Sequence, residues 1–246
     1  MKRGVLLLLM ALLMLLPSVA FAQSVTVDLG SAGDGSAATR IVQLTALIAL
    51  LSLAPSLLVM VTAFARIVIV LSLLRAALGT QGTPPNTVLI GLALFLTFFV
   101  MQPAFEQAWT LGILPMTEGQ VSEIEGMRLA AEPFRGFMVA NLRAEDLSLF
   151  LDIAALPPPE APALTPWRAL VPAFLVGELR RAFEIGFLLF VPFLVIDLVV
   201  ASVLMSMGMM MLPPTVVSLP FKLIFFVLLD GWYMIAGSLV QSYGPF

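Results

Sequence analysis

Long uninterrupted apolar runs dominate this chain of 246 residues and decide what it can fold into. Four such segments follow the first forty residues, at positions 41–74, 87–104, 185–207 and 216–240. About 20 apolar residues in a helix span a bilayer, and only helices and closed barrels satisfy their backbone polar groups there. The sequence therefore predicts an all-α, polytopic membrane protein built of helical hairpins.

The first 22 residues have the pattern of a cleaved signal peptide. A basic start precedes a twelve-residue apolar core at 5–16, and a small-x-small cleavage pattern ends at Ala22. Such a core spans only about 18 Å as a helix, short of the ~30 Å hydrocarbon layer, which disfavours the alternative of a retained first span. We expect residues 23–40, rich in Gly, Ser and Asp, to form a flexible periplasmic segment.

The rest of the chain divides by composition into three parts. We expect a first helical hairpin at 41–104, kinked at Pro55, because proline removes a backbone donor and clashes with the preceding turn. Residues 105–166 should form an acidic, helical, periplasmic segment, with an amphipathic helix broken at Pro133 and a linker that is rich in proline. A second hairpin at 167–246 carries a methionine loop at 205–214.

The distribution of basic residues conflicts with a simple four-span topology. With the amino terminus outside, the two short inner loops should be rich in Lys and Arg. Only Arg75 lies there, whereas Arg40, Arg180 and Arg181 fall on the expected outer side. We interpret this as a sign that other subunits, more than lipid, hold these helices.

The methionine loop is the most unusual local feature. Gly208 and the pair Pro213-Pro214 are helix breakers that end both arms of the hairpin. Between them Met209, Met210 and Met211 are consecutive, so they cannot share one face of a helix. Because methionine is unbranched and polarizable, several copies of the loop around an axis could seal a channel and still repack around a passing peptide. The alternative is an apolar turn in contact with lipid.

Asp197 and Lys222 are charged residues inside otherwise apolar segments. Each unpaired charge at the centre of a span costs about 2.5–3.5 kcal/mol on insertion scales. The two positions are equidistant from the middle of the methionine loop, so in a symmetric hairpin they lie at similar depth. We expect them to pair, either within one hairpin or between neighbouring hairpins, and to contribute to packing and assembly.

Arg66 is a third embedded charge and has no acidic residue opposite it in its own hairpin. We expect its counter-charge in another segment or another chain, with snorkelling to an interface as the alternative. Farther along, Glu178 with Arg181 and Arg180 with Glu184 have helical pair spacing, which is typical of a solvated helix start at the membrane edge.

Composition and charge exclude several classes of function. The chain has neither cysteine nor histidine, so thiolate nucleophiles, histidine-based zinc sites and imidazole catalysis are absent. Charged residues make up 11% of the chain and the net charge is −3 without a basic run, which leaves no basis for nucleic-acid binding. We expect no cofactor, no metal and no enzymatic activity.

Two other functions are compatible with parts of the pattern. An intramembrane aspartyl protease needs two carboxylates that share a proton, but Asp230 lies near the opposite membrane face from the loop, at a different depth from Asp197. A self-sufficient ion or small-solute transporter could use Asp197 and Lys222 as a gating pair. Four spans without a repeat or paired discontinuous helices argue against it.

Three long stretches, 52–86, 172–214 and 218–232, closely resemble the FliP family of type III secretion export gates. With the second apolar segment they cover most of the chain after Arg40, the acidic segment being the main part left out. Gly177 departs from the hydroxyl residue that the family usually has before its glutamate. The signal peptide and the Leu-Pro-Pro after the methionines resemble flagellar members more than virulence members.

The resemblance implies an assembly, its partners and its location. Members form a pentamer that combines with FliR and FliQ in a helical, cone-shaped pore complex, with FlhA and FlhB docking beneath. Unfolded flagellar proteins pass through its centre, and the loop that matches Met209, Met210 and Met211 is the gasket that closes the pore. The expected location is the bacterial inner membrane, in the flagellar basal body and largely on the periplasmic side.

Overall fold

The computed structural model describes residues 59–80, 82–209 and 211–244, together with positions 42, 44, 45, 48, 49, 52 and 56. The chain divides into two units, Met1–Ser52 and Leu53–Phe246, and the few described residues of the first are helical. The predicted signal peptide with cleavage after Ala22, the predicted flexible segment 23–40, the predicted kink at Pro55 and Met210 lie outside the described residues.

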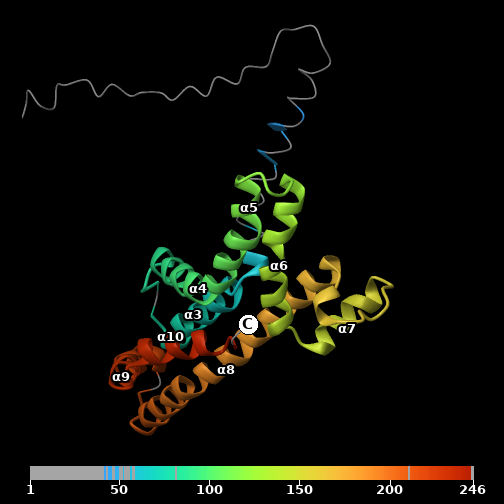
Figure 1. Ribbon diagram of the computed structural model, residues 1–246. Helices are drawn as coiled ribbons and strands as arrows, with labels where there is room; N and C mark the ends of the chain where they lie inside the picture. The colour runs from blue at the N-terminus through green and yellow to red at the C-terminus, as the bar shows by residue number, and fades with distance from the viewer. Residues whose placement is uncertain are drawn as a thin grey trace, which may run out of the picture. The chain divides into compact units, whose positions relative to one another are not determined.

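The second unit begins with a pair of packed helices, α3 (Phe64–Leu78) and α4 (Asn86–Ala108) (Figure 1). Helix α3 ends at Gly79, whose N–H donates to the carbonyl of Ala76 at 3.1 Å. Its left-handed conformation, with φ of 75°, is the usual way to close a helix. Two prolines then prevent an earlier restart, and α4 begins directly after Pro85.

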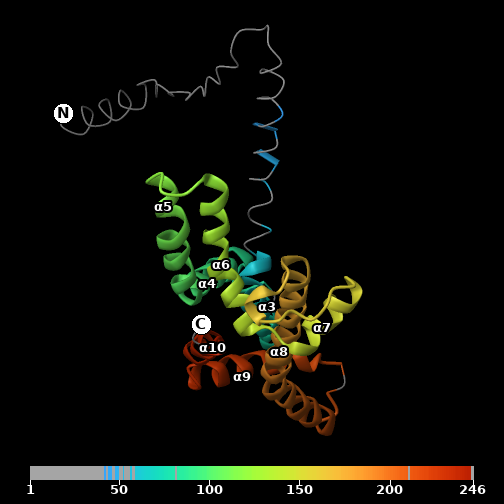
Figure 2. The same cartoon turned by 45° about the vertical axis from the view of Figure 1, so that its right-hand side comes forward.

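Helix α4 continues past its apolar part into a second, more polar pair of helices. It is followed without interruption by a π-helical turn, η1 (Trp109–Ile113), and by α5 (Leu114–Thr117). Helix α6 (Glu123–Asn141) packs back against α4 and η1 (Figure 2). It starts where the side chain of Ser122 accepts a hydrogen bond from the N–H of Glu125, a standard amino-terminal cap.

The predicted helix break at Pro133 is wrong. Helix α6 runs through this residue to Asn141, and the chain breaks only there, before α7 (Ala144–Ile153). Pro133 is buried, and α6 packs against α4 and η1 along this stretch. Tertiary packing therefore outweighs the lost backbone donor, as it often does for local propensity.

The segment that is rich in proline is tied back to α6. It contains one short 3₁₀ turn, η2 (Pro162–Leu164). Arg135 donates from Nη1 to the carbonyl of Thr165 at 2.7 Å, and its guanidinium lies 4.5 Å from the ring centre of Trp167. These contacts fix the point at which the next helix begins.

Helix α8 (Trp167–Ser206) is 40 residues long and merges two stretches that the sequence separated. It passes through Pro172 and Pro192 and packs against α3, α6, α7 and α9. At 1.5 Å per residue its length is about 60 Å, roughly twice the hydrocarbon thickness of a bilayer.

The fourth apolar segment is bent rather than continuous. Helix α9 (Pro214–Leu228) and helix α10 (Gly231–Gln241) meet at an angle of 63°. Asp230 has a φ of 49°, and a Cβ on Gly231 would lie 2.2 Å from the ring of Phe226. Only glycine fits there, so the Asp-Gly pair fixes the position of the elbow.

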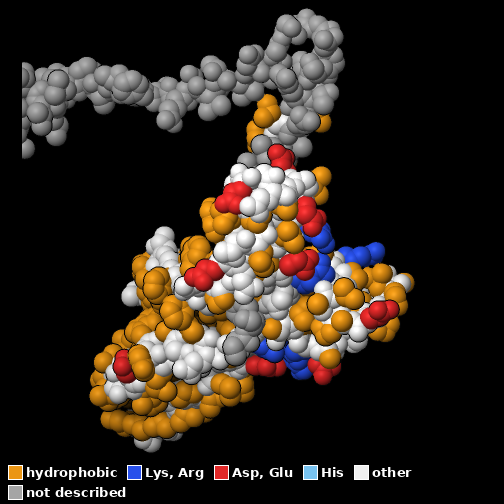
Figure 3. Space-filling view, viewed as in Figure 1, with side chains coloured by type: hydrophobic (Ala, Val, Ile, Leu, Met, Phe, Trp, Pro, Cys, Tyr) orange, Lys and Arg blue, Asp and Glu red, His pale blue; other side chains and the backbone are white. Residues whose placement is uncertain are grey.

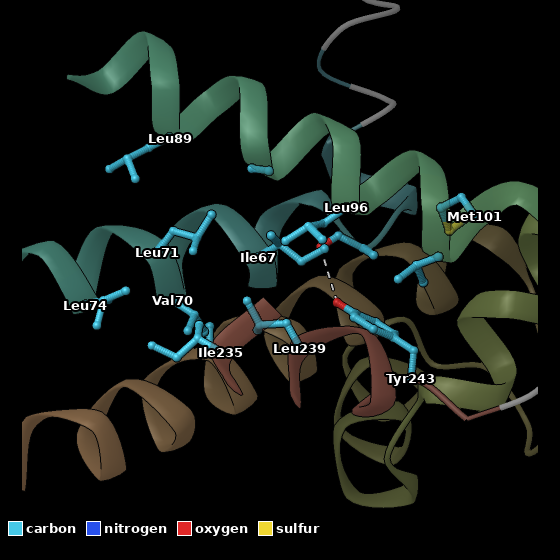
Figure 4. Packing of buried hydrophobic residues seen from close by; sticks show 14 of the residues in the cluster. Ile67, Val70, Leu71, Leu74, Leu89, Leu96, Met101, Ile235, Leu239 and Tyr243 are labelled. Carbon is cyan, nitrogen blue, oxygen red and sulfur yellow. Dashed lines mark hydrogen bonds between the residues drawn. The ribbon is translucent and has the colours of Figure 1, made fainter. Parts of the chain in front are cut away.

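The core of this unit surrounds α3. Figure 4 shows Ile67, Val70 and Leu74 of α3 in a row above Ile235, Leu239 and Tyr243 near the end of the chain. Leucines of α4 and aromatic residues of α6 and α8 complete the cluster. A helix enclosed on several sides in this way has a buried environment even at one of its two arginines, Arg66.

Apolar side chains also cover much of the outer surface. Figure 3 shows them gathered over α8, α9 and α10, whereas most charged side chains lie over α6, α7 and the start of α8. Within the described part of the chain, two helical runs, Asn86–Thr117 and Trp167–Ser206, are long and apolar enough to cross a membrane. The bent pair α9–α10 is a third if it counts as one span.

Candidate functional site

The methionine loop lies at the tip of the α8–α9 hairpin. Gly208 has a φ of 76°, and the N–H of Met209 donates to the carbonyl of Leu204 at 3.0 Å, which closes α8. Pro213 and Pro214 begin α9, where proline costs no hydrogen bond. Met211 is 98% exposed and Met209 40% exposed. The loop thus presents thioether side chains outward from a well-closed helix end.

A charged cluster lies a few turns below the loop. The Nζ of Lys222 lies 2.6 Å from Oδ2 of Asp197 within the same hairpin, one of the two arrangements that the sequence left open. The hydroxyl of Ser218 donates to Oδ1 of that carboxylate. Lys222 also donates to the carbonyl of Ala77 at 3.1 Å, at the end of α3. The lysine therefore joins α8 and α9 to the carboxyl end of a third helix, where a cation is favoured.

This cluster borders a cavity of about 510 Å³. The side chain of Lys222 is 6% exposed and that of Asp197 is 30% exposed, so the carboxylate faces the cavity and the ammonium is enclosed. On the outer side of the same hairpin, an apolar groove of about 560 Å³ runs between valines of α8 and phenylalanines of α9.

A second charged cluster joins the beginning of α3 to α8. Arg66 donates to Glu178 in a bidentate pair, from Nε to Oε2 at 2.9 Å and from Nη2 to Oε1. Both side chains are fully enclosed, with exposures of 1% and 0%. Arg66 thus has its counter-charge in another segment of the same chain, 112 positions away.

The predicted pair of Glu178 with Arg181 is wrong, because Glu178 points into the core. The other pair on this stretch does form: Arg180 Nε lies 3.0 Å from Oε1 of Glu184, and both side chains are more than half exposed. The first turns of α8 therefore carry a buried carboxylate on one face and a solvated ion pair on another.

Two residues near the end of the chain complete the second cluster, and no local sequence pattern points to them. Arg66 Nη1 donates to Oγ of Ser242 at 2.9 Å and to its carbonyl at 3.3 Å. The hydroxyl of Tyr243 donates to Oε2 of Glu178 at 2.6 Å, and its ring centre lies 3.8 Å from Cζ of Arg66. Burial raises the pKa of the Tyr243 phenol well above its usual value, which keeps it protonated as a donor.

The arrangement does not resemble a catalytic centre. Asp197 is engaged by Lys222 and Ser218, whereas Asp230 lies exposed at the elbow between α9 and α10. Within the residues that the structure describes, no group of three or more acidic side chains is placed to hold a metal ion. The charges instead connect helices to one another, which is a structural use of buried ion pairs.

The fold and the site together define a class of protein: a helical membrane protein with internally paired charges and a methionine loop at a hairpin tip. Comparison with known proteins identifies the family. The model of the FliP family matches residues 47–239, and the chain belongs to that family.

The chain is similar to curated flagellar biosynthetic proteins FliP from distant bacteria. It is 56% identical to the protein of Caulobacter vibrioides, over 93% of this chain and 86% of that one. It is 50% identical to that of Agrobacterium fabrum, over 95% and 96% of the two chains, and 49% identical to that of Bacillus subtilis, over 88% and 98%. The chain is therefore a membrane component of flagellar biosynthesis and protein export.

Proposed function

We propose that this chain is a core channel subunit of the flagellar type III export gate, which conducts unfolded flagellar proteins across the inner membrane. The observation that carries the proposal is the methionine loop at the tip of the α8–α9 hairpin, with Met209 and Met211 exposed. Within a single chain, Met211 is left almost fully exposed and Met209 partly so. Several copies arranged around an axis would bring them together as a gasket.

The gasket has to seal against ions and yet yield to a polypeptide. Consecutive Met209, Met210 and Met211 can close on one another through dispersion contacts and repack around different side chains, because each has three rotatable bonds. A rigid arm is needed to position such a soft tip. The cluster of Asp197, Lys222 and the Ala77 carbonyl supports this arm by tying the hairpin to α3.

The proposed gate contains further copies and other subunits. A pentamer of this chain, joined by FliR and FliQ and with FlhA and FlhB beneath it, would cover the apolar side chains over α8 and α9. The length of α8, about 60 Å, supports a position largely on the periplasmic side, because a bilayer covers only about 30 Å of it. Helices held by neighbours also account for the weak positive-inside bias.

Replacement of the three loop methionines by alanine tests the proposal against a self-sufficient transporter. With the gasket removed, cells should leak small ions while flagellar proteins are still exported. The same change at two exposed methionines outside the loop, Met127 and Met234, is the matched control and should leave the membrane tight. An unchanged ion barrier in the loop variant would contradict the gasket and favour the transporter.

A further inference from the structure

The charged cluster of Arg66 and Glu178 is closed by Ser242 and Tyr243, which follow helix α10. Two nitrogens of Arg66 bind Glu178, and the third, Nη1, has both of its acceptors on Ser242. Tyr243 binds the carboxylate from the other side and covers the guanidinium with its ring. Its hydroxyl also lies 3.2 Å from the carbonyl of Ala63 (Figure 4). The tail therefore supplies the outer wall of the ion pair.

We propose that Ser242 and Tyr243 act as a latch, a strap that docks on the Arg66–Glu178 pair and can release without unfolding the rest of the unit. When it is docked, the latch excludes water from the ion pair and supplies hydrogen-bond acceptors to Nη1 of Arg66. Released, it leaves Nη1 without acceptors and opens the pair to solvent, which weakens the attraction between the charges.

The segment that carries the latch is a short helix of its own, set off from α9 by a bend. Helix α10 has only 11 residues, and its buried positions are Gly231, Ile235 and Leu239. It is joined to α9 at the elbow, where Asp230 adopts a left-handed conformation and its side chain makes no cap hydrogen bond. Release must separate Leu239 and Tyr243 from the core around α3, including the ring of Phe137, which stacks on Tyr243 at 5.6 Å between ring centres. Local opening of a short element costs less free energy than global unfolding, and its cost rises with the contacts that it breaks.

A separate charged cluster holds the opposite end of α3. There Lys222 binds the carbonyl of Ala77 and the carboxylate of Asp197, and this cluster lies on the α9 side of the elbow. Release of the latch therefore leaves the methionine hairpin attached to α3. The two ends of α3 should respond independently to changes in the tail.

The absence of cysteine from the natural chain makes a clean accessibility experiment possible. One reporter is Ala63→Cys, at a fully buried position beside the latch, and the other is Ala77→Cys, at 2% exposure beside Lys222. Each is placed in the full chain in detergent, and its rate of reaction with a maleimide is measured with and without Tyr243→Ala. We expect the Ala63 reporter to react roughly tenfold faster or more, since a hydrogen bond to a charged group is lost, and the Ala77 reporter to keep its rate.

Two further variants test whether a faster reaction at Ala63 is due to loss of the Tyr243 side chain. Tyr233→Ala changes the other tyrosine of the chain, which is 77% exposed, and should leave both reporters slow. Tyr243→Phe keeps the ring over Arg66 and removes only the hydroxyl, so the Ala63 reporter should have an intermediate rate. An unchanged rate at Ala63 in Tyr243→Ala would show that the tail does not shield the pair. Equal acceleration of both reporters would show loss of the core, and either result overturns the latch.

Discussion

At the scale of single residues, two ion pairs that involve helix α8 differ in how much they contribute to stability. Arg66 and Glu178 are enclosed and satisfy each other with two hydrogen bonds, whereas Arg180 and Glu184 form an exposed pair on the same helix. Removing one partner of an enclosed pair leaves an uncompensated charge, which costs about 3–5 kcal/mol. Exposed pairs contribute about 0–1 kcal/mol because water and salt screen them.

Glu178→Gln and Glu184→Gln therefore form a matched test on one helix. We expect the first to lower the melting temperature in detergent by many degrees and the second to leave it nearly unchanged. The measurement is thermal unfolding of the full chain followed by circular dichroism. Similar melting temperatures for the two variants would show that the enclosed pair contributes no more stability than the exposed pair.

Asp197 and Lys222 give a second test, in which the pairing itself is measured. Asp197→Ala should impair folding or assembly by less than the full cost of a buried charge, because the carboxylate is partly exposed. Lys222→Ala in addition should restore part of the loss, since the enclosed ammonium is then gone. Levels of assembled protein in the four combinations measure the coupling. Two fully additive defects would count against a pair.

At the scale of elements, the elbow between α9 and α10 depends on one glycine. A Cβ at Gly231 would meet the ring of Phe226 at 2.2 Å, so Gly231→Ala should move the ring or the elbow and destabilise the unit. Gly237 lies in the same helix with open space around it, and Gly237→Ala should stabilise by about 0.5–1 kcal/mol. Melting temperatures that move in opposite directions are expected, and equal shifts would contradict the packing argument.

Three features of the helices show which parts of the fold could be predicted from the sequence and which could not. The pairing of Asp197 with Lys222 was predictable because a symmetric hairpin relates positions by simple counting. The elbow was missed although Asp230-Gly231 is a common turn dipeptide, because the apolar pattern continues across it. The predicted break at Pro133 rests on the local rule that proline interrupts a helix. The packing of α6 against α4 and η1 outweighs this effect, and the helix continues.

At the scale of the whole molecule, the features that sequence reasoning missed are long-range. Glu178 has the spacing of an ordinary surface pair with Arg181, and only the packing of α3 on α8 brings it to Arg66. Ser242 and Tyr243 lie more than 170 positions from that arginine and carry no local motif. Apolar runs predicted that helices form, but which faces they bury is decided by contacts between distant segments.

In the proposed gate the methionine loops of several copies meet at one axis, so the loops of neighbouring copies should lie close enough to be cross-linked. Because the natural chain lacks cysteine, Met211→Cys introduces a single thiol at a 98% exposed position at the hairpin tip. Leu164→Cys, in the linker at 64% exposure, is the control. After mild oxidation in membranes that contain the other export components, we expect covalent dimers from the loop position only. A loop thiol that reacts with a maleimide but forms no dimer would contradict a gasket built from several copies.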